Sequence, residues 1–139
     1  MNEFKFSDLY VGQKESFNYE ITKEKMEMFL KITKDINPLH NDEEYAKEKG
    51  YPSVVVYGLL TTSALSTLAG VYLPGKYSLI HSIEMSYVKP VFLENCPLEV
   101  NGEILELDER FSKFTLKVTI YDNKKNKVCR GKMQIGVSA

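Results

Sequence analysis

Apolar residues in the first third of the chain recur at helical spacing. Over residues 22–34 they repeat every three to four positions, and Thr22 is a suitable N-cap for a helix there. A second, shorter helix is predicted to begin after Asp42, another N-cap residue, and to close at Gly50. Residues 35–41 are therefore expected to form a loop between two helices.

The segment 58–73 reads GLLTTSALSTLAGVYL and contains no charged residue. A helix that is apolar on all sides is a buried helix, because no side of it prefers water. Pro74 and Gly75 follow the segment and end it. The pattern thus predicts one long buried helix in the middle of the chain.

The remainder of the chain alternates between apolar and polar residues with a period of two, as strands do. Long strands are predicted over 77–87, 98–107, 114–120 and 128–137. Short polar turns such as 122–126 join them, which favours an antiparallel meander over a parallel sheet. The positions expected to share one strand face are Tyr77, Leu79, Ile83, Met85 and Tyr87 and, in another strand, Phe114, Leu116, Val118 and Ile120.

These elements predict an α+β protein with the hotdog fold, in which an antiparallel sheet wraps around one long buried helix. At 139 residues the chain has the length of one compact domain, so a single domain over 1–139 is expected. The exposed edge strands of such a sheet invite pairing with a second copy. We therefore expect a homodimer or a higher homo-oligomer.

Composition and charge exclude several classes of function. The 18 basic and 19 acidic residues give a formal net charge of -1, which lacks the basic footprint of a nucleic-acid-binding protein. The densest basic cluster, Lys124, Lys125 and Lys127, is typical of a solvated turn. No secretion signal is recognisable, and no segment approaches the roughly 20 apolar residues that span a bilayer. A cytoplasmic protein without a membrane partner is expected.

Metal and cofactor chemistry find no support in the motifs. Cys96 and Cys129 are the only cysteines and lack C-x-x-C spacing, so neither a zinc site nor a disulfide is predicted. There is no glycine-rich phosphate loop, no G-x-S-x-G and no H-E-x-x-H. No metal and no cofactor are therefore expected.

The candidate chemistry lies in the loop 35–41, where Asp35 and His40 flank a rigid Asn37-Pro38 turn. A carboxylate and an imidazole held together are suited to proton transfer. By spacing alone, however, a structural interpretation is favoured. Asp35 would then end the helix, Asn37 would close an Asx turn, and His40 would pack beside the second helix.

The start of the buried helix changes that assessment, because it offers an oxyanion site at a fixed distance from the loop. The first turn of a helix has unpaired N–H groups and a partial positive charge. Tyr57-Gly58 opens this helix, and a glycine lets a substrate oxygen approach the backbone closely. The loop and the helix start are expected to face each other.

The sequence resembles the MaoC-like dehydratases, a family that includes the (R)-specific enoyl-CoA hydratases. The resemblance covers most of the chain, and the family's D-x-N-P-x-H motif is matched by Asp35, Asn37, Pro38 and His40. Further positions that look like family segments are Asp42, Ala46, Tyr57-Gly58, Ser66, 73–76 and 89–92.

The resemblance implies a homodimeric hotdog enzyme that adds water to a 2-enoyl thioester, or dehydrates a 3-hydroxyacyl thioester, on coenzyme A or acyl carrier protein. Asp35 and His40 would bind and activate one water molecule, and which of them is the base stays open. The Gly58 N–H would stabilise the negative charge that develops on the thioester oxygen.

Three further residues are candidates for the substrate site, namely Asn37, Tyr57 and Ser66. Ser66 either hydrogen-bonds into the site, as in the family, or bonds to a carbonyl of its own helix. Tyr57 stands where relatives usually have histidine, which alters the wall of the site, and Glu94-Asn95 stands where many have Gly-Asp. His81 is expected to be a packed strand residue rather than a catalyst.

Two other functions stay open. A hotdog thioesterase would release free thiol from an acyl thioester and leave the double bond alone. A non-catalytic hotdog dimer would bind acyl chains and use Asp35 and His40 only as loop architecture, and Tyr57 in place of histidine is the feature that favours it.

Overall fold

The computed structural model describes all residues from Met1 to Ala139. One antiparallel sheet has the strand order β1-β3-β4-β5-β2. The strands are β1 (Lys14–Tyr19), β2 (Ser78–Tyr87), β3 (Leu98–Asp108), β4 (Lys113–Tyr121) and β5 (Lys127–Val137). The helices are α1 (Lys23–Thr33), α2 (Glu43–Glu48), α3 (Gly58–Thr62) and α4 (Ala64–Thr67), with shorter turns η1 (Phe6–Asp8), η2 (Pro38–His40), η3 (Leu68–Tyr72) and η4 (Leu93–Asn95).

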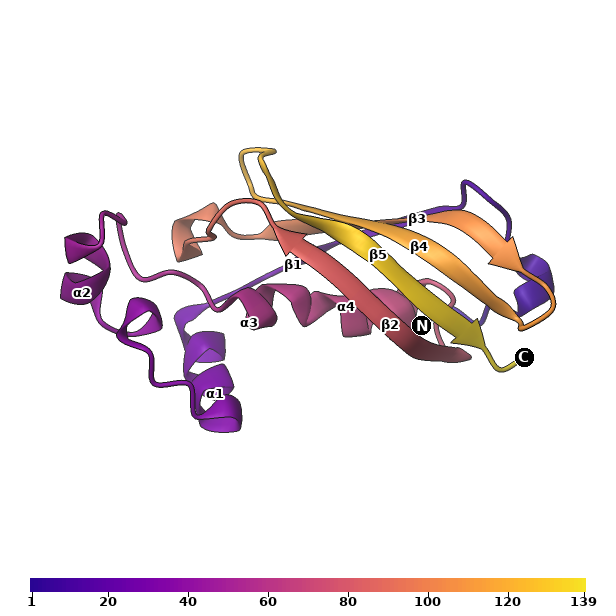
Figure 1. The fold of residues 1–139 in the computed structure, drawn as a ribbon, viewed down its shortest axis with the longest axis horizontal. Coiled ribbons are helices and arrows are strands. Elements are labelled where there is room, and N and C mark those ends of the chain that lie inside the picture. The colour runs from indigo at the N-terminus through magenta and orange to yellow at the C-terminus, as the bar shows by residue number, and fades with distance from the viewer.

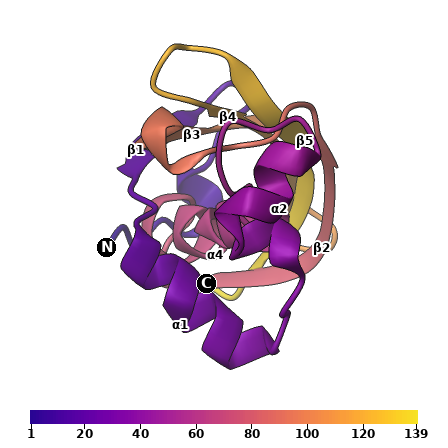
Figure 2. The same cartoon turned by 90° about the vertical axis from the view of Figure 1, so that its left-hand side faces the viewer.

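The sheet curves around the central helix, as the hotdog fold requires. Figure 1 shows the sheet lying over α3 and α4, with α1 and α2 at one end of the molecule. Figure 2, seen from that end, shows the strands bending around α4 from β1 to β2. The predicted antiparallel hotdog arrangement is confirmed. Strand β1 was not predicted, because Phe17 and Tyr19 are its only apolar residues.

The core lies between the concave face of the sheet and the central helix. The four side chains of β4 predicted to share a face are all at most 1% exposed, and Leu65 and Leu68 of the helix are fully buried against the sheet. Each fully buried side chain of this size contributes about 1.5–3 kcal/mol to the stability of the fold. This packing fixes where the helix begins and therefore where Gly58 lies.

The central helix is buried on one side only, so the prediction of a helix buried all round was wrong for the single chain. Its three segments α3, α4 and η3 follow one another from Gly58 to Tyr72, the last as a π-helix. Leu59 is 69% exposed and Ser66 is also exposed, because the curved sheet of one chain covers a single face of the helix.

Strand β2 contains a bulge, which corrects the prediction that its apolar residues share one face. Ile80 pairs with Ile135 and Ser82 pairs with Gln134, so His81 has no partner and the alternation changes there. Leu79 therefore lies on the opposite face of the sheet from Ile83, Met85 and Tyr87. His81 packs over Gly136, where a Cβ would lie 2.6 Å from the imidazole Nε2. As expected, it is a strand residue, but it is exposed at the bulge rather than buried by packing.

The turn between β4 and β5 is organised by Asp122, which is only 7% exposed. Its carboxylate Oδ1 accepts hydrogen bonds from the backbone N–H groups of Lys124 and Asn126, each at 2.9 Å. Burial alone would raise the pKa of Asp122, but the N–H groups of Asn126 and Lys124 outweigh it and hold the pKa below its ordinary value.

Replacing Asp122 is therefore expected to destabilise the fold and to change its acid sensitivity. Asp122→Ala should lower the free energy of unfolding by about 1–3 kcal/mol at neutral pH. Folding lowers the pKa of Asp122, so its carboxylate stabilises the fold fully at pH values above its pKa in the unfolded chain. This stabilisation is lost as the pH falls through its pKa in the folded protein. Urea unfolding of the unmodified and Asp122→Ala proteins at a series of pH values below 7 measures this effect. The difference between their free energies of unfolding should become smaller as the pH falls. A difference that stays constant would contradict the lowered pKa of Asp122.

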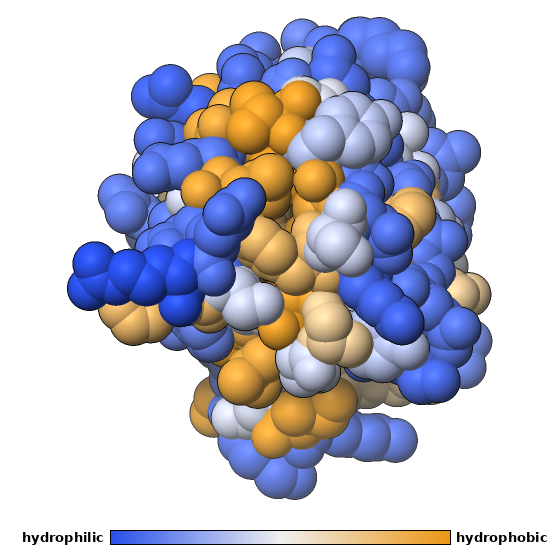
Figure 3. All heavy atoms as spheres, turned by 90° about the vertical axis from the view of Figure 1, so that its right-hand side faces the viewer, coloured by the Kyte–Doolittle hydropathy of each residue, from blue (hydrophilic) through white to orange (hydrophobic).

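The end of the molecule that carries the turn between β3 and β4 presents a band of apolar side chains between polar flanks (Figure 3). Segments at this end carry the exposed apolar residues Tyr10, Val11 and Phe111. They lie at the opposite end of the sheet from α1 and α2. None of the helices is both long enough and apolar enough to cross a bilayer.

Candidate active site

The loop between α1 and α2 is held in one conformation by its own side chains. Helix α1 ends at Lys34 in the left-handed conformation, with φ of 60°. The Asp35 Oδ1 then accepts a hydrogen bond from the Asn37 N–H at 3.1 Å, and the Asn37 Oδ1 accepts one from the Leu39 N–H at 3.0 Å. Pro38 begins the single turn η2, which ends at His40. Asn37 thus closes the predicted Asx turn.

The half-buried His40 ring is oriented by the segment that leads to the central helix. Its Nδ1 lies 2.7 Å from the carbonyl oxygen of Val55, while the Val55 N–H donates to the Leu39 carbonyl at 3.0 Å. A carbonyl can only accept, so Nδ1 carries the proton and donates it. The Nε2 of His40 is therefore the nitrogen left with a lone pair, the state that a general base requires.

Tyr57 links His40 to Asp35. Tyr57 is 3% exposed. Its ring stacks on the His40 ring, with 4.2 Å between the centroids, and packs against the tilted Phe29 ring, with 4.8 Å between the centroids. Its hydroxyl donates to the main-chain carbonyl of Asp35 at 2.9 Å. Burial raises the pKa of Tyr57, and the nearby Asp35 carboxylate adds to the rise, so the hydroxyl stays a donor. Tyr57 therefore supports both members of the pair.

Gly58 follows Tyr57 as the first residue of α3, so its N–H has no acceptor within the helix. The glycine also leaves room for the Tyr87 ring, because a Cβ at this position would lie 3.0 Å from that ring, closer than most Cβ contacts. A helix start with an unpaired N–H and no side chain is suited to bind an oxyanion.

Asp35, His40 and Gly58 line one cavity of about 230 Å³, named here the catalytic cavity. The loop and the helix start therefore converge, as the sequence predicted. The remaining lining residues are Phe29, Tyr57, Leu59 and Tyr87.

A second cavity of about 280 Å³, named here the inner cavity, shares His40, Gly58 and Tyr87 with the first. Burial raises the pKa of Cys129, one of its walls, to about 11, so this thiol is neutral and does not act as a nucleophile. The other lining residues are Val55, Val56, Thr61, Val88, Lys89, Pro90 and Val91. The largely apolar lining is suited to an acyl group.

Two of the predicted site residues lie elsewhere. Asn37 is exposed and lines neither cavity, so its place in the structure is that of a turn residue. Ser66 is exposed on the side of the central helix that the sheet does not cover, and it also lines neither cavity. Thr61, by contrast, lines the inner cavity and was not predicted. A polar residue one helical turn after Gly58 was the available signal.

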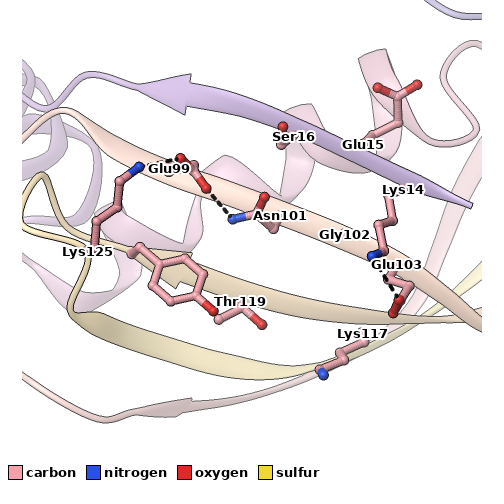
Figure 4. A pocket seen from close by; sticks show the side chains of 11 residues that line it. Lys14, Glu15, Ser16, Glu99, Asn101, Gly102, Glu103, Lys117, Thr119 and Lys125 are labelled. Carbon is pink, nitrogen blue, oxygen red and sulfur yellow. Dashed lines mark hydrogen bonds and ion pairs between the residues drawn. The ribbon is translucent and has the colours of Figure 1, made fainter. Parts of the chain in front are cut away.

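The largest hollow of the molecule, about 670 Å³, lies far from this chemistry, on the convex face of β1, β3 and β4. Figure 4 shows two ion pairs among its charged side chains, while Lys117 and Glu15 lie apart from them. Lys125 bonds Glu99 at 3.2 Å, and Lys14 lies 3.8 Å from Glu103. Because the lining is almost entirely polar and carries both signs of charge, we assign this hollow to the solvated face of the sheet.

The sequence of the chain is similar to those of known proteins. The family model "MaoC like domain" matches residues 10–128. The (R)-specific enoyl-CoA hydratase of Aeromonas caviae is 31% identical over 111 residues, which cover 79% of this chain and 83% of that protein. The 3-hydroxybutyryl-CoA dehydratase of Methylorubrum extorquens is 32% identical over 102 residues, covering 73% of this chain and 64% of that protein.

A solved structure agrees with the fold. The (R)-hydratase of A. caviae involved in PHA biosynthesis superimposes with a TM-score of 0.86 at 27% identity, over 93% of this chain and 97% of that chain. The protein described here has the hotdog fold of an acyl-thioester hydratase. It belongs to the MaoC-like domain family.

Proposed function

We propose that this protein is a hydro-lyase that reversibly adds water to the double bond of a 2-enoyl thioester carried by coenzyme A or acyl carrier protein. The observation that carries the proposal is the catalytic cavity, where a carboxylate, an oriented imidazole and an unpaired helix N–H meet. Relatives named as an enoyl-CoA hydratase and a hydroxybutyryl-CoA dehydratase support the same reaction.

The three groups divide the reaction between them. Asp35 and His40 hold one water molecule, and one of them takes its proton as the oxygen bonds to C3 of the enoyl group. The π electrons of the C2–C3 bond move toward the thioester, and the Gly58 N–H stabilises the negative charge on its oxygen. A proton delivered to C2 by the pair completes the 3-hydroxyacyl product. Dehydration is the same sequence in reverse.

A panel of 2-enoyl thioesters of several chain lengths on both carriers tests this proposal. Purified protein should consume the absorbance of the conjugated thioester without releasing free thiol. Thiol release with the double bond retained would instead identify a thioesterase. Binding without turnover of any thioester would identify a non-catalytic acyl-binding protein.

We further propose that two copies form a homodimer through β2. This strand is an edge of the sheet and is ten residues long, which leaves a long row of unpaired backbone groups. Ile83 and Tyr87 on its concave face are each 50% exposed, and Leu59 of the neighbouring helix is 69% exposed. Tyr87 and Leu59 also line the catalytic cavity, so a partner seated here would close it.

The dimer is tested by placing a charge on that strand. Ile83→Glu should convert a dimer into a monomer, because a buried carboxylate without a partner is costly. Val11→Glu is the control, since Val11 is 60% exposed and lies in the segment before β1, at the opposite edge of the sheet from β2. Sedimentation velocity measures the outcome. A monomeric unmodified protein, or an Ile83→Glu protein that stays dimeric, would rule out this interface.

A further inference from the structure

Thr61 carries a buried hydroxyl with no hydrogen-bond partner. The residue is 1% exposed, and its Oγ1 is the buried side-chain oxygen in the structure that neither donates nor accepts. Buried hydroxyl groups are nearly always paired, because leaving one unpaired destabilises the fold. An exception in a wall of the inner cavity therefore points to a ligand as the missing partner.

Its neighbours on the same helix show that pairing was available. The Thr62 hydroxyl donates to the Gly58 carbonyl at 3.2 Å and also contacts the Tyr87 hydroxyl at 2.9 Å. The Ser63 hydroxyl donates to the Leu60 carbonyl. Bonding back to the helix is the usual fate of Ser and Thr in helices. Thr61 is the hydroxyl of this turn that stays free.

The position of Thr61 indicates which ligand atom it meets. It lies three residues after Gly58, so the two residues share a face of the helix, and both line the inner cavity together with His40. The rest of that lining is mostly apolar, so a hydroxyl there is suited to a single oxygen of an otherwise apolar group.

We propose that Thr61 is a catalytic residue whose hydroxyl donates a hydrogen bond to the thioester carbonyl oxygen, as a second donor beside the Gly58 N–H. This rests on the proposed hydratase function. The bond strengthens as the carbonyl oxygen gains charge during water addition, so Thr61 stabilises the transition state more than the bound substrate. No covalent step involves Thr61.

The test compares Thr61→Val, Thr61→Ser and the control Thr67→Val in hydration of a 2-butenoyl-CoA. Thr61→Val should lower kcat about 100-fold, the effect typical of losing one oxyanion donor. Thr61→Ser should restore most of the rate. Thr67→Val should leave it unchanged, because Thr67 lies on the same helix but lines neither cavity. The melting temperature of Thr61→Val should be unchanged or higher, since a methyl replaces an unpaired hydroxyl.

Inhibition by butanoyl-CoA shows whether Thr61 contacts the thioester carbonyl oxygen or the oxygen of the added water. This saturated thioester has the carbonyl oxygen but no oxygen at C3. A higher inhibition constant in Thr61→Val supports the carbonyl contact. An unchanged constant together with a slower reaction would place Thr61 on the added water and overturn the assignment. An unchanged reaction rate in Thr61→Val, with active unmodified protein, would also overturn it, whereas inactivity of the unmodified protein would refute the hydratase function itself.

Discussion

Asp35→Asn should lower kcat/KM for enoyl-thioester hydration by about 10²–10⁴-fold, the contribution typical of one general acid or base. The amide is close to the carboxylate in size, and its oxygen can still accept the hydrogen bond from the Asn37 N–H that orders the loop. Asp35 is also exposed, so its replacement leaves the core intact. Steady-state hydration rates with thermal melting of the same preparation would measure both effects.

Asp42→Asn is the matched control for that variant. Asp42 belongs to the same region, is exposed, and caps α2 by accepting a hydrogen bond from the Tyr45 N–H at 3.2 Å. Asparagine caps a helix about as well as aspartate. The control should therefore keep its activity and stability. A fully active Asp35→Asn protein would show that the carboxylate takes no part in the chemistry.

Tyr57→Ala should produce the largest loss of stability, about 3–5 kcal/mol in the free energy of unfolding, as for other buried aromatic residues. The substitution removes the ring that packs against Phe29 and His40 and the hydroxyl that donates to the Asp35 carbonyl. Denaturant unfolding measures the loss. The hydration rate should fall as well, because both catalytic side chains lose their support.

Tyr57→Phe separates the ring from the hydroxyl. It keeps both ring contacts and should cost only about 0.5–1.5 kcal/mol, the net value of one hydrogen bond. Tyr10→Ala is the control for removing a tyrosine ring, because Tyr10 is 62% exposed and its loss should change stability by less than about 0.5 kcal/mol. Equal losses in Tyr57→Ala and Tyr10→Ala would contradict the supporting role of the Tyr57 ring.

Much of the fold was predictable because its local signals are strong. Thr22 and Asp42 cap α1 and α2 as predicted, and Gly50 adopts a positive φ of 89° after α2. The pairing of β3, β4 and β5 followed from period-two alternation and short turns. The meander prediction was wrong for β2, which pairs with β5 instead of β3, because a long connection after Tyr87 lets it cross to the other edge of the sheet. The bulge at His81 was not predicted. The adjacent apolar residues Leu79 and Ile80 interrupt the alternation there, but they do not by themselves locate an extra residue in an edge strand.

The candidate site was predictable in part. The Asp35 and His40 pair could be found because the Asn-Pro turn between them is recognisable in the sequence. The helix start could be found because a glycine opens the uncharged segment. The side-chain partners could not, because the stack of Tyr57 on His40 and the free hydroxyl of Thr61 depend on packing between segments distant in the sequence. Ser66 lies on the side of the helix that one chain leaves uncovered, and its role in the site stays a prediction.

The contacts of Tyr57 bear on its replacement of the histidine that relatives usually have at this position. As a departure from the family pattern it favoured a changed or absent activity. In the structure its hydroxyl reaches the Asp35 carbonyl and its ring supports His40, while Gly58 remains open at the helix start. The substitution therefore preserves the parts that the proposed reaction requires.

The most direct test of water addition at the catalytic cavity is to run the reaction in water labelled with heavy oxygen and locate the label by mass spectrometry. A 2-enoyl-CoA incubated with the protein should yield an intact 3-hydroxyacyl thioester with the heavy oxygen at C3, and Asp35→Asn should abolish its formation. Heavy oxygen in a free carboxylate, or an enoyl thioester that stays unlabelled and unchanged, would contradict the addition of water to the double bond at the catalytic cavity.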